Sequence, residues 1–215
     1  MGGKDGGLLT LSQGEKLVRL ARKAALSYMS KGLAIAPEDT KGIFGQARGV
    51  FVTVESYPSH DLRGCIGYPL PESPLAQAVC ENAINATCND SRFERMGIKE
   101  LDSVVFEISV LTVPLPLKYA QSKELPRLVK VGKDGLIVKK GWHSGLLLPQ
   151  VPVEWGWNSE EFLSHTCEKA GMMPDAWKEQ DMEWLSFQAQ IFSEKSPKGK
   201  VVETKIADIK KGKTD

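Results

Sequence analysis

The sequence lacks the features that mark membrane proteins and nucleic-acid-binding proteins. No run of about 18 apolar residues occurs, so no membrane-spanning helix is predicted. The first residues contain no apolar segment of the signal-peptide type. Twenty-eight basic residues are balanced by 27 acidic residues, which leaves a formal net charge of +1 and no strong signal for nucleic acid. These absences together predict a cytoplasmic protein.

Cysteine and histidine are scarce, and their spacing is not that of a metal site. The four cysteines are Cys65, Cys80, Cys88 and Cys167. They form no Cys-x-x-Cys pair, and the three histidines show no ligand-like spacing with them. In a cytoplasmic chain these cysteines are expected to be thiols. No metal or cofactor is predicted, since no phosphate-binding glycine loop occurs either.

What the sequence does contain is the patterning of a globular protein with both helices and strands. Apolar residues at helical spacing predict helices over residues 12–31, 73–88 and 158–170. Alternating apolar residues predict strands over residues 49–56, 62–67, 103–113, 136–139, 146–148 and 183–193. Ser12, Ser73 and Asn158 are the predicted N-caps. Strands joined mainly by hairpins favour an α+β fold with an antiparallel sheet flanked by helices.

The middle of the chain is predicted to form a smaller, β-rich subdomain. Two prolines, Pro114 and Pro116, mark its start, and it extends over about residues 115–152. The larger subdomain is predicted to combine about residues 11–114 with 153–194. The glycine-rich residues 1–10 and the lysine-rich residues 195–215 are predicted to be flexible.

The hexapeptide at residues 62–67, Leu-Arg-Gly-Cys-Ile-Gly, carries the strongest chemical signal. On a strand, Arg63, Cys65 and Gly67 share one face, and a guanidinium beside a thiol favours the nucleophilic thiolate. Gly64 and Gly67 remove bulk, as they would where a ligand or another backbone approaches. The alternative is a small, packed cysteine in a core strand, with an arginine that extends toward solvent.

Glu107 is unusual because it lies in the middle of an otherwise apolar strand. An unpaired buried carboxylate is costly. Either this face of the strand is solvated, or Glu107 meets a cation across the sheet, for which Arg63 is a candidate.

Two polar segments are further candidates. Residues 90–93, Asp-Ser-Arg-Phe, read as a capped turn with a local salt link, although Asp90 or Arg92 could instead point into a cleft. His143 lies on a glycine-flanked turn, where it is either an exposed loop histidine or part of a site.

These segments resemble the motifs of the AMMECR-type domain family. The shared blocks are residues 62–67, 90–93, 109–112, 141–145 and 148–151, and the resemblance covers about residues 10–194. It implies an α+β fold with two subdomains, the smaller one from the middle of the chain. His143 belongs to the microbial version of its turn.

The resemblance also implies where the site lies and what it works with. The residues that it marks are Arg63, Gly64, Cys65, Gly67, Asp90, Ser91, Arg92 and Ser109. Relatives fused to, or encoded beside, Memo-like and radical-SAM proteins imply a role in a modification pathway with such partners. The family has no settled reaction.

Two functions are compatible with these residues. In an enzyme, Cys65 attacks as a thiolate, Glu107 or His143 acts as acid or base, and backbone N–H groups near the two glycines receive an oxyanion. In a binding or adaptor module, Arg63 and Arg92 hold an anionic small molecule or a partner protein's carboxylate. Cys65 is then present for its small volume.

Overall fold

The structure, a computed structural model, describes residues 7–208. The described chain forms two compact units. The first unit contains residues 7–113 and 190–204, and the second contains residues 114–189 and 205–208. Each unit has its own antiparallel strand pairs and its own helices. The α+β fold predicted from the sequence, with a β-rich part from the middle of the chain, is therefore confirmed.

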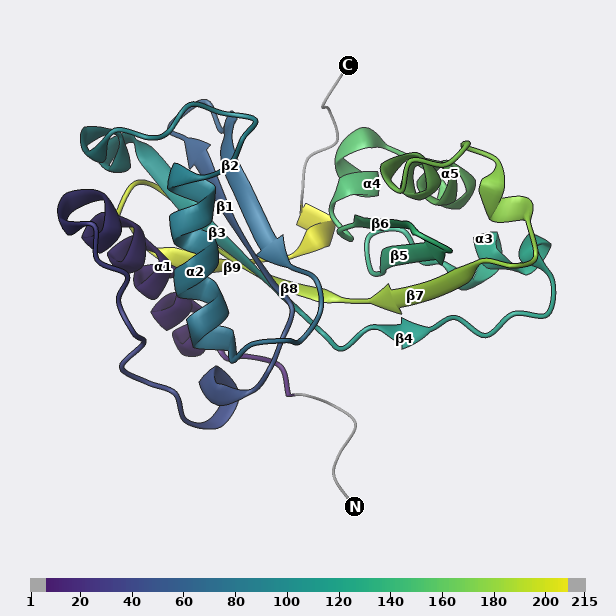
Figure 1. Ribbon diagram of the computed structural model, residues 1–215, viewed down its shortest axis with the longest axis horizontal. Helices are drawn as coiled ribbons and strands as arrows, with labels where there is room; N and C mark the ends of the chain where they lie inside the picture. The colour runs from purple at the N-terminus through teal and green to yellow at the C-terminus, as the bar shows by residue number, and fades with distance from the viewer. Residues whose placement is uncertain (1–6, 209–215) are drawn as a thin grey trace. The chain divides into compact units, whose positions relative to one another are not determined.

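The first unit is built on a five-stranded sheet (Figure 1). Its order is β2-β1-β3-β8-β9. The strands are β1 (Val50–Ser56), β2 (Leu62–Tyr68), β3 (Val104–Leu111), β8 (Ala189–Glu194) and β9 (Val201–Thr204). The hexapeptide therefore forms a strand at the edge of the sheet, next to the central pair β1 and β3.

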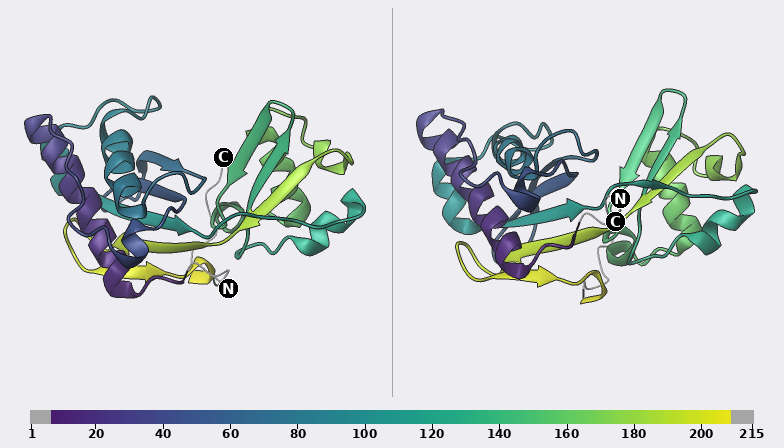
Figure 2. Two further views of the ribbon diagram at one scale, coloured as in Figure 1. Left: turned by 60° about the horizontal axis from the view of Figure 1, so that its bottom comes forward. Right: turned by 90° about the horizontal axis from the view of Figure 1, so that it is seen from below.

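Helices α1 (Leu11–Lys31) and α2 (Leu75–Cys88) cover one face of this sheet (Figure 1). Figure 2 shows α1 beside β9, which comes from the end of the chain. The core between helices and sheet includes Leu17, Val79, Val52 and Ile108, all fully buried. Two short 3₁₀ helices, η1 (Gly42–Gly45) and η2 (Ile98–Ser103), complete this unit.

The second unit is built on a four-stranded sheet with the order β4-β7-β5-β6. The strands are β4 (Leu115–Pro116), β5 (Gly135–Lys140), β6 (His143–Leu147) and β7 (Glu183–Phe187). The helices are α3 (Leu125–Leu128), α4 (Val151–Trp155) and α5 (Ser159–Lys169), with 3₁₀ turns η3 (Ser122–Glu124), η4 (Ala176–Lys178) and η5 (Ile206–Asp208). Helix α5 packs on β5 and β6 around a core that includes Phe162, Leu163 and Trp184.

The structure corrects two of the predicted helix caps. Thr10, rather than Ser12, caps α1: its hydroxyl accepts a bond from the Gln13 backbone N–H, and the Gln13 side chain accepts one from Thr10. This reciprocal capping box satisfies two otherwise unpaired backbone donors. Pro74, rather than Ser73, occupies the N-cap position of α2. The predicted cap of α5 at Asn158 is confirmed.

The strand predicted over residues 183–193 is two strands in two sheets. It divides at Gln188 into β7, which belongs to the four-stranded sheet, and β8, which belongs to the five-stranded sheet. A strand also forms in the predicted flexible tail, where Val201 is buried and β9 pairs with β8. Residues 1–6 and 209–215, also predicted to be flexible, lie outside the described residues.

Two further expectations concern the membrane and the thiols. Among residues 7–208, no helix is both long enough and apolar enough to cross a membrane.

All four cysteines are free thiols, as predicted. Cys80 and Cys167 are fully buried, and burial raises the pKa of each to about 11.

Candidate functional site

The hexapeptide places its cysteine on the sheet face opposite to the helices. In the strand register, Cys65 lies opposite Thr53, and Thr53 lies opposite Glu107 on the next strand. One step along, Gly67 lies opposite Phe51, and Phe51 opposite Ser109. Directly opposed residues share a face of the sheet. These two rows define the motif face: Phe51, Thr53, Cys65, Gly67, Glu107 and Ser109.

The two glycines of the hexapeptide are explained by packing within the chain. A Cβ on Gly64 would overlap the backbone carbonyl of Ala86, so this glycine allows α2 to approach β2 closely. A Cβ on Gly67 would overlap the ring of Phe51. The predicted approach of another backbone is thus found at Gly64, while an aromatic ring fills the space over Gly67.

The segment 90–93 clamps the backbone of Cys65. The Asp90 carboxylate accepts a hydrogen bond from the Cys65 N–H at 2.9 Å, and the Arg92 guanidinium donates one to the Cys65 carbonyl at 2.9 Å. Arg92 Nε also bonds Asp90 Oδ1 at 2.9 Å. Because β2 is an edge strand, these outward-facing backbone groups have no neighbouring strand to bond. Asp90 and Arg92 therefore replace that strand at one position.

Arg63 does not act on the thiol as predicted. Its Nε donates to Glu100 Oε1 at 2.5 Å, and its Nη2 to Glu100 Oε2 at 3.3 Å. This bidentate pair ties β2 to η2, so the partner of Arg63 is Glu100 rather than Glu107. The guanidinium whose charge acts on Cys65 is that of Arg92.

The surroundings of Cys65 disfavour its thiolate form. Burial raises the pKa of the thiol, and the nearby charges of Glu107 and Asp90 act in the same direction. The hydrogen bond between Thr53 and the sulfur, at 3.4 Å, and the charge of Arg92 oppose this effect without reversing it. The pKa of Cys65 therefore lies above its ordinary value, in contrast to the predicted thiolate.

The pKa of the Asp90 carboxyl is shifted in the other direction, below its ordinary value. Hydrogen bonds from Arg92 are the main cause that lowers the pKa of its carboxyl to about 2. The same pair raises the pKa of Arg92. Asp90 is buried, whereas about half of the Arg92 side chain, 52%, is exposed. The ionised pair is thus a permanent feature of the site at neutral pH.

The other candidate residues have varied surroundings. Ser109 is buried, and within residues 7–208 its hydroxyl has no hydrogen-bond partner. Ser91 is exposed on its turn. His143 begins β6 in the second unit, where its Nδ1 lies 3.1 Å from the Ala170 carbonyl oxygen. The structure therefore unites Cys65, Glu107, Ser109, Asp90 and Arg92 around β1–β3, and places His143 in the other unit.

Two residues at the site were not predicted from the sequence. Thr53 contacts the Cys65 sulfur, and Glu100 pairs with Arg63. The hairpin between β1 and β2 indicated that some β1 residue would oppose Cys65. A bulge between Val54 and Glu55 shifts the register, so the sequence did not identify which one.

The site has no metal-binding geometry among the residues that the structure describes. No group of three or more histidine, cysteine, aspartate or glutamate side chains there is arranged to hold an ion. The site offers a thiol with a raised pKa, a partly exposed guanidinium, two hydroxyls and the Glu107 carboxylate.

The chain is similar to known proteins over most of its length. The sequence profile of the AMMECR1 family matches residues 18–192. A protein of Thermococcus gammatolerans is 52% identical over 192 residues, which cover 87% of this chain and 93% of that protein. Protein MJ0810 of Methanocaldococcus jannaschii is 46% identical, over 93% of this chain and 98% of its own.

A solved structure is also similar. The crystal structure of an uncharacterized protein, PH0010 from Pyrococcus horikoshii, superposes with a TM-score of 0.85 at 48% sequence identity. The match covers 89% of this chain and 96% of that one.

Proposed function

The chain belongs to the AMMECR1 family. On that premise we propose that it is a non-catalytic binding module. Its motif face would hold a small molecule or a partner protein. The observation that carries the proposal is how Cys65 is held: Asp90 and Arg92 bond its backbone, and the residue is largely buried. Burial raises the pKa of the Cys65 thiol, and a neutral thiol is a poor nucleophile. Cys65 then serves as a small, weakly polar part of the binding surface.

The arginines of the site support binding more than activation of a nucleophile. Arg63 is engaged by Glu100, and only 18% of its side chain is exposed. Arg92 is held by Asp90 but keeps 52% of its side chain exposed. An anionic group of a ligand or partner would therefore reach Arg92 more readily than Arg63, because the Arg92 side chain is the more exposed of the two.

Two hydroxyls and a carboxylate on the motif face supply polar contacts. Thr53 and Glu107 are partly buried and lie in one row with Cys65. The buried Ser109 hydroxyl, which has no hydrogen-bond partner among the described residues, would gain one from a bound polar group. A buried hydroxyl without a partner costs about 1–3 kcal/mol, so a ligand that bonds it recovers that free energy.

For the partner, we propose a Memo-like or a radical-SAM protein. This class rests on the family resemblance, which links relatives to such proteins in a modification pathway. A non-catalytic module in that setting would present or stabilise a substrate or a partner enzyme.

The test is a binding titration between this chain and a purified Memo-like or radical-SAM protein from the same organism. Cys65→Ser should bind within about twofold of wild type, because a neutral thiol and a hydroxyl have similar size and polarity. Glu107→Lys reverses a charge on the motif face and should weaken binding at least about tenfold, as charge reversals in interfaces do.

The matched control is Glu72→Lys, which makes the same charge change on an exposed loop of the same unit. It should bind like wild type. Thermal melts establish that each variant is folded. Equal binding by Glu107→Lys and wild type, or no binding by wild type, would contradict the proposal.

A second candidate is a cysteine-dependent enzyme in the same pathway. One observation favours it: the Thr53 hydrogen bond and the Arg92 charge both oppose the rise in the pKa of Cys65 that burial causes. Glu107, in the same row, would accept the thiol proton. This candidate requires a thiolate at neutral pH, and therefore a thiol pKa below the ordinary value of about 8.5.

A further inference from the structure

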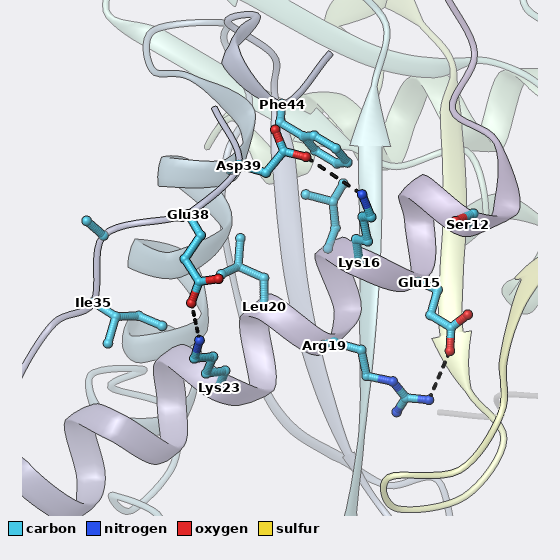
Figure 3. A pocket seen from close by; sticks show the side chains of 13 residues that line it. Ser12, Glu15, Lys16, Arg19, Leu20, Lys23, Ile35, Glu38, Asp39 and Phe44 are labelled. Atoms are coloured by element: carbon cyan, nitrogen blue, oxygen red, sulfur yellow. Dashed lines mark hydrogen bonds and ion pairs between the residues drawn. The ribbon is translucent and has the colours of Figure 1, made fainter. Parts of the chain in front are cut away.

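A separate cavity lies in the first unit between α1 and the segment that follows it (Figure 3). Its volume is about 480 Å³, within the range of small-molecule sites. It is lined by α1, by residues 35–44 and by Ala76 at the start of α2. None of its lining residues belongs to the motif face.

The cavity has an apolar floor and a charged rim. The floor is formed by Leu17, Leu20, Ile35, Phe44 and Ala76. The rim carries three cations and three carboxylates: Lys16, Arg19, Lys23, Glu15, Glu38 and Asp39. This arrangement suits an amphipathic molecule, since the floor buries an apolar body while the rim binds a charged head group.

Two ion pairs connect the cations of α1 to the carboxylates of the facing segment (Figure 3). Lys23 Nζ lies 2.6 Å from Glu38 Oε1, and Lys16 Nζ lies 3.7 Å from Asp39 Oδ2. All four side chains are at least half exposed. Exposed pairs of this kind contribute about 0–1 kcal/mol each, so a ligand can displace them.

Lys16 is the less satisfied of the two lysines. Its 3.7 Å distance to Asp39 is too long for a hydrogen bond. Within the part of the chain that the structure describes, this contact is its single ion pair. Its Nζ also lies over the ring of Phe44, 5.7 Å from the ring centre, in a cation–π contact beside the apolar floor. A head group bound to Lys16 would therefore place an attached apolar chain against Phe44.

We propose that this cavity is a binding site for an amphipathic organic carboxylate, with its carboxylate on Lys16 and its apolar body on the Leu17–Leu20–Phe44 floor. A carboxylate is favoured over an ammonium because α1 contributes three cations to the rim and one carboxylate, Glu15, which pairs with Arg19. The other two carboxylates, Glu38 and Asp39, lie on a segment without helix or strand. The helical side of the rim therefore carries an excess of positive charge. In the unbound protein, Asp39 occupies the position of the ligand carboxylate and competes with it.

The experiment titrates the intact chain with three probes that share one apolar body: octanoate, octan-1-ol and octylamine. Backbone amide NMR shifts locate the binding and give each dissociation constant. Octanoate should bind at least about threefold more tightly than octan-1-ol, the size of one exposed charge interaction. Octylamine should bind most weakly, and the shifts should concentrate in residues 12–23 and 35–44.

Variants separate the proposed head-group contact from general apolar binding. Lys16→Met keeps the aliphatic stem and should weaken octanoate about threefold to fivefold while leaving octan-1-ol unchanged. Asp39→Asn removes the competing carboxylate and should tighten octanoate about twofold to threefold. Lys31→Met, the same change at an exposed position of α1 outside the cavity, should bind octanoate like wild type.

Opposite effects of Lys16→Met and Asp39→Asn on octanoate would establish the site. The proposal is overturned if octan-1-ol binds as tightly as octanoate, if octylamine binds best, or if the shifts fall outside the cavity. It is equally overturned if none of the probes binds to the folded wild-type chain.

Discussion

Cys65 is fixed by its backbone as much as by its side chain. Its N–H and its carbonyl are both bonded by the pair Asp90 and Arg92, and its sulfur is bonded by Thr53. With so many contacts, the thiol has a defined position at the edge of the sheet. A fixed, neutral thiol suits recognition, because a binding surface needs a constant shape and polarity.

Gly64 lies where α2 packs closely on β2, so its substitution should destabilise the fold. Gly64→Ala would place a methyl group against the Ala86 carbonyl. The backbone of α2 cannot move aside as the end of a flexible side chain can. The free energy of unfolding, from urea denaturation, should fall by about 1–3 kcal/mol or more. Gly97→Ala is the control, since a Cβ there meets nothing within 4 Å.

Gly97 has φ −79 and ψ 145, which alanine adopts readily. Gly97→Ala should therefore be neutral or slightly stabilising. Equal effects of the two substitutions would show that α2 does not approach β2 as closely as the structure indicates.

Single residues were partly predictable from the sequence. The alternation along β3 correctly placed Glu107 on the face opposite to Val104, Phe106 and Ile108, which are buried under the helices. The partner of Arg63 was not predictable, because Glu100 is distant along the chain and no periodicity connects the two. Such contacts depend on how η2 packs beside the sheet.

At the scale of elements, the clamp on the edge strand β2 makes a pH-dependent prediction. The folded-state pKa of Asp90 is lowered to about 2, so its ionised form stabilises the fold above the unfolded pKa and this contribution is lost as the pH falls toward 2. Asp90→Asn should reduce the free energy of unfolding at pH 7 by about 2 kcal/mol.

The difference between wild type and Asp90→Asn should then shrink as the pH falls from about 4 toward 2. Urea denaturation at several pH values measures it. Asp61→Asn, at an exposed turn position, is the control and should have little effect at any pH. A difference between wild type and Asp90→Asn that stays constant with pH would show that the carboxylate charge is not what stabilises the clamp.

Elements were easier to predict than their connections. The helices α1 and α5 and the strands β1, β2 and β3 follow directly from their apolar periodicity. The break between β7 and β8 was missed because the alternation of apolar and polar residues continues across it, while the chain moves from one sheet to the other. Local pattern specifies a strand but not the sheet that it joins.

At the scale of the whole molecule, residues 190–204 return to the first unit and hold its helix and sheet together. Glu194 on β8 is buried and accepts hydrogen bonds from Arg19 and Arg22 of α1 and from the Phe106 N–H of β3. Arg22 also donates to the carbonyls of Leu101 and Val104. One carboxylate therefore joins the first helix, the central strand and a strand from the far end of the sequence.

Removal of that charge should destabilise the first unit strongly. Glu194→Gln leaves the buried Arg22 without its ion-pair partner, which typically costs about 3–5 kcal/mol. Differential scanning calorimetry should show a lower melting temperature. Glu203→Gln, the same change on the exposed part of β9, is the control and should cost less than about 1 kcal/mol. Similar melting temperatures for the two variants would show that Glu194 does not stabilise the first unit in this way.

The pH dependence of Cys65 alkylation tests the central claim, a neutral thiol on a binding face, most directly. Iodoacetamide is added between pH 5 and 9, and modification of Cys65 and of the partly buried Cys88 is followed by mass spectrometry, with Cys65→Ser as the blank. The raised pKa predicts a Cys65 rate that is low at pH 7 and still rises at pH 9. A plateau with a midpoint near pH 7 or below, and a Cys65 rate well above that of Cys88, would contradict the binding-module account and favour a nucleophile.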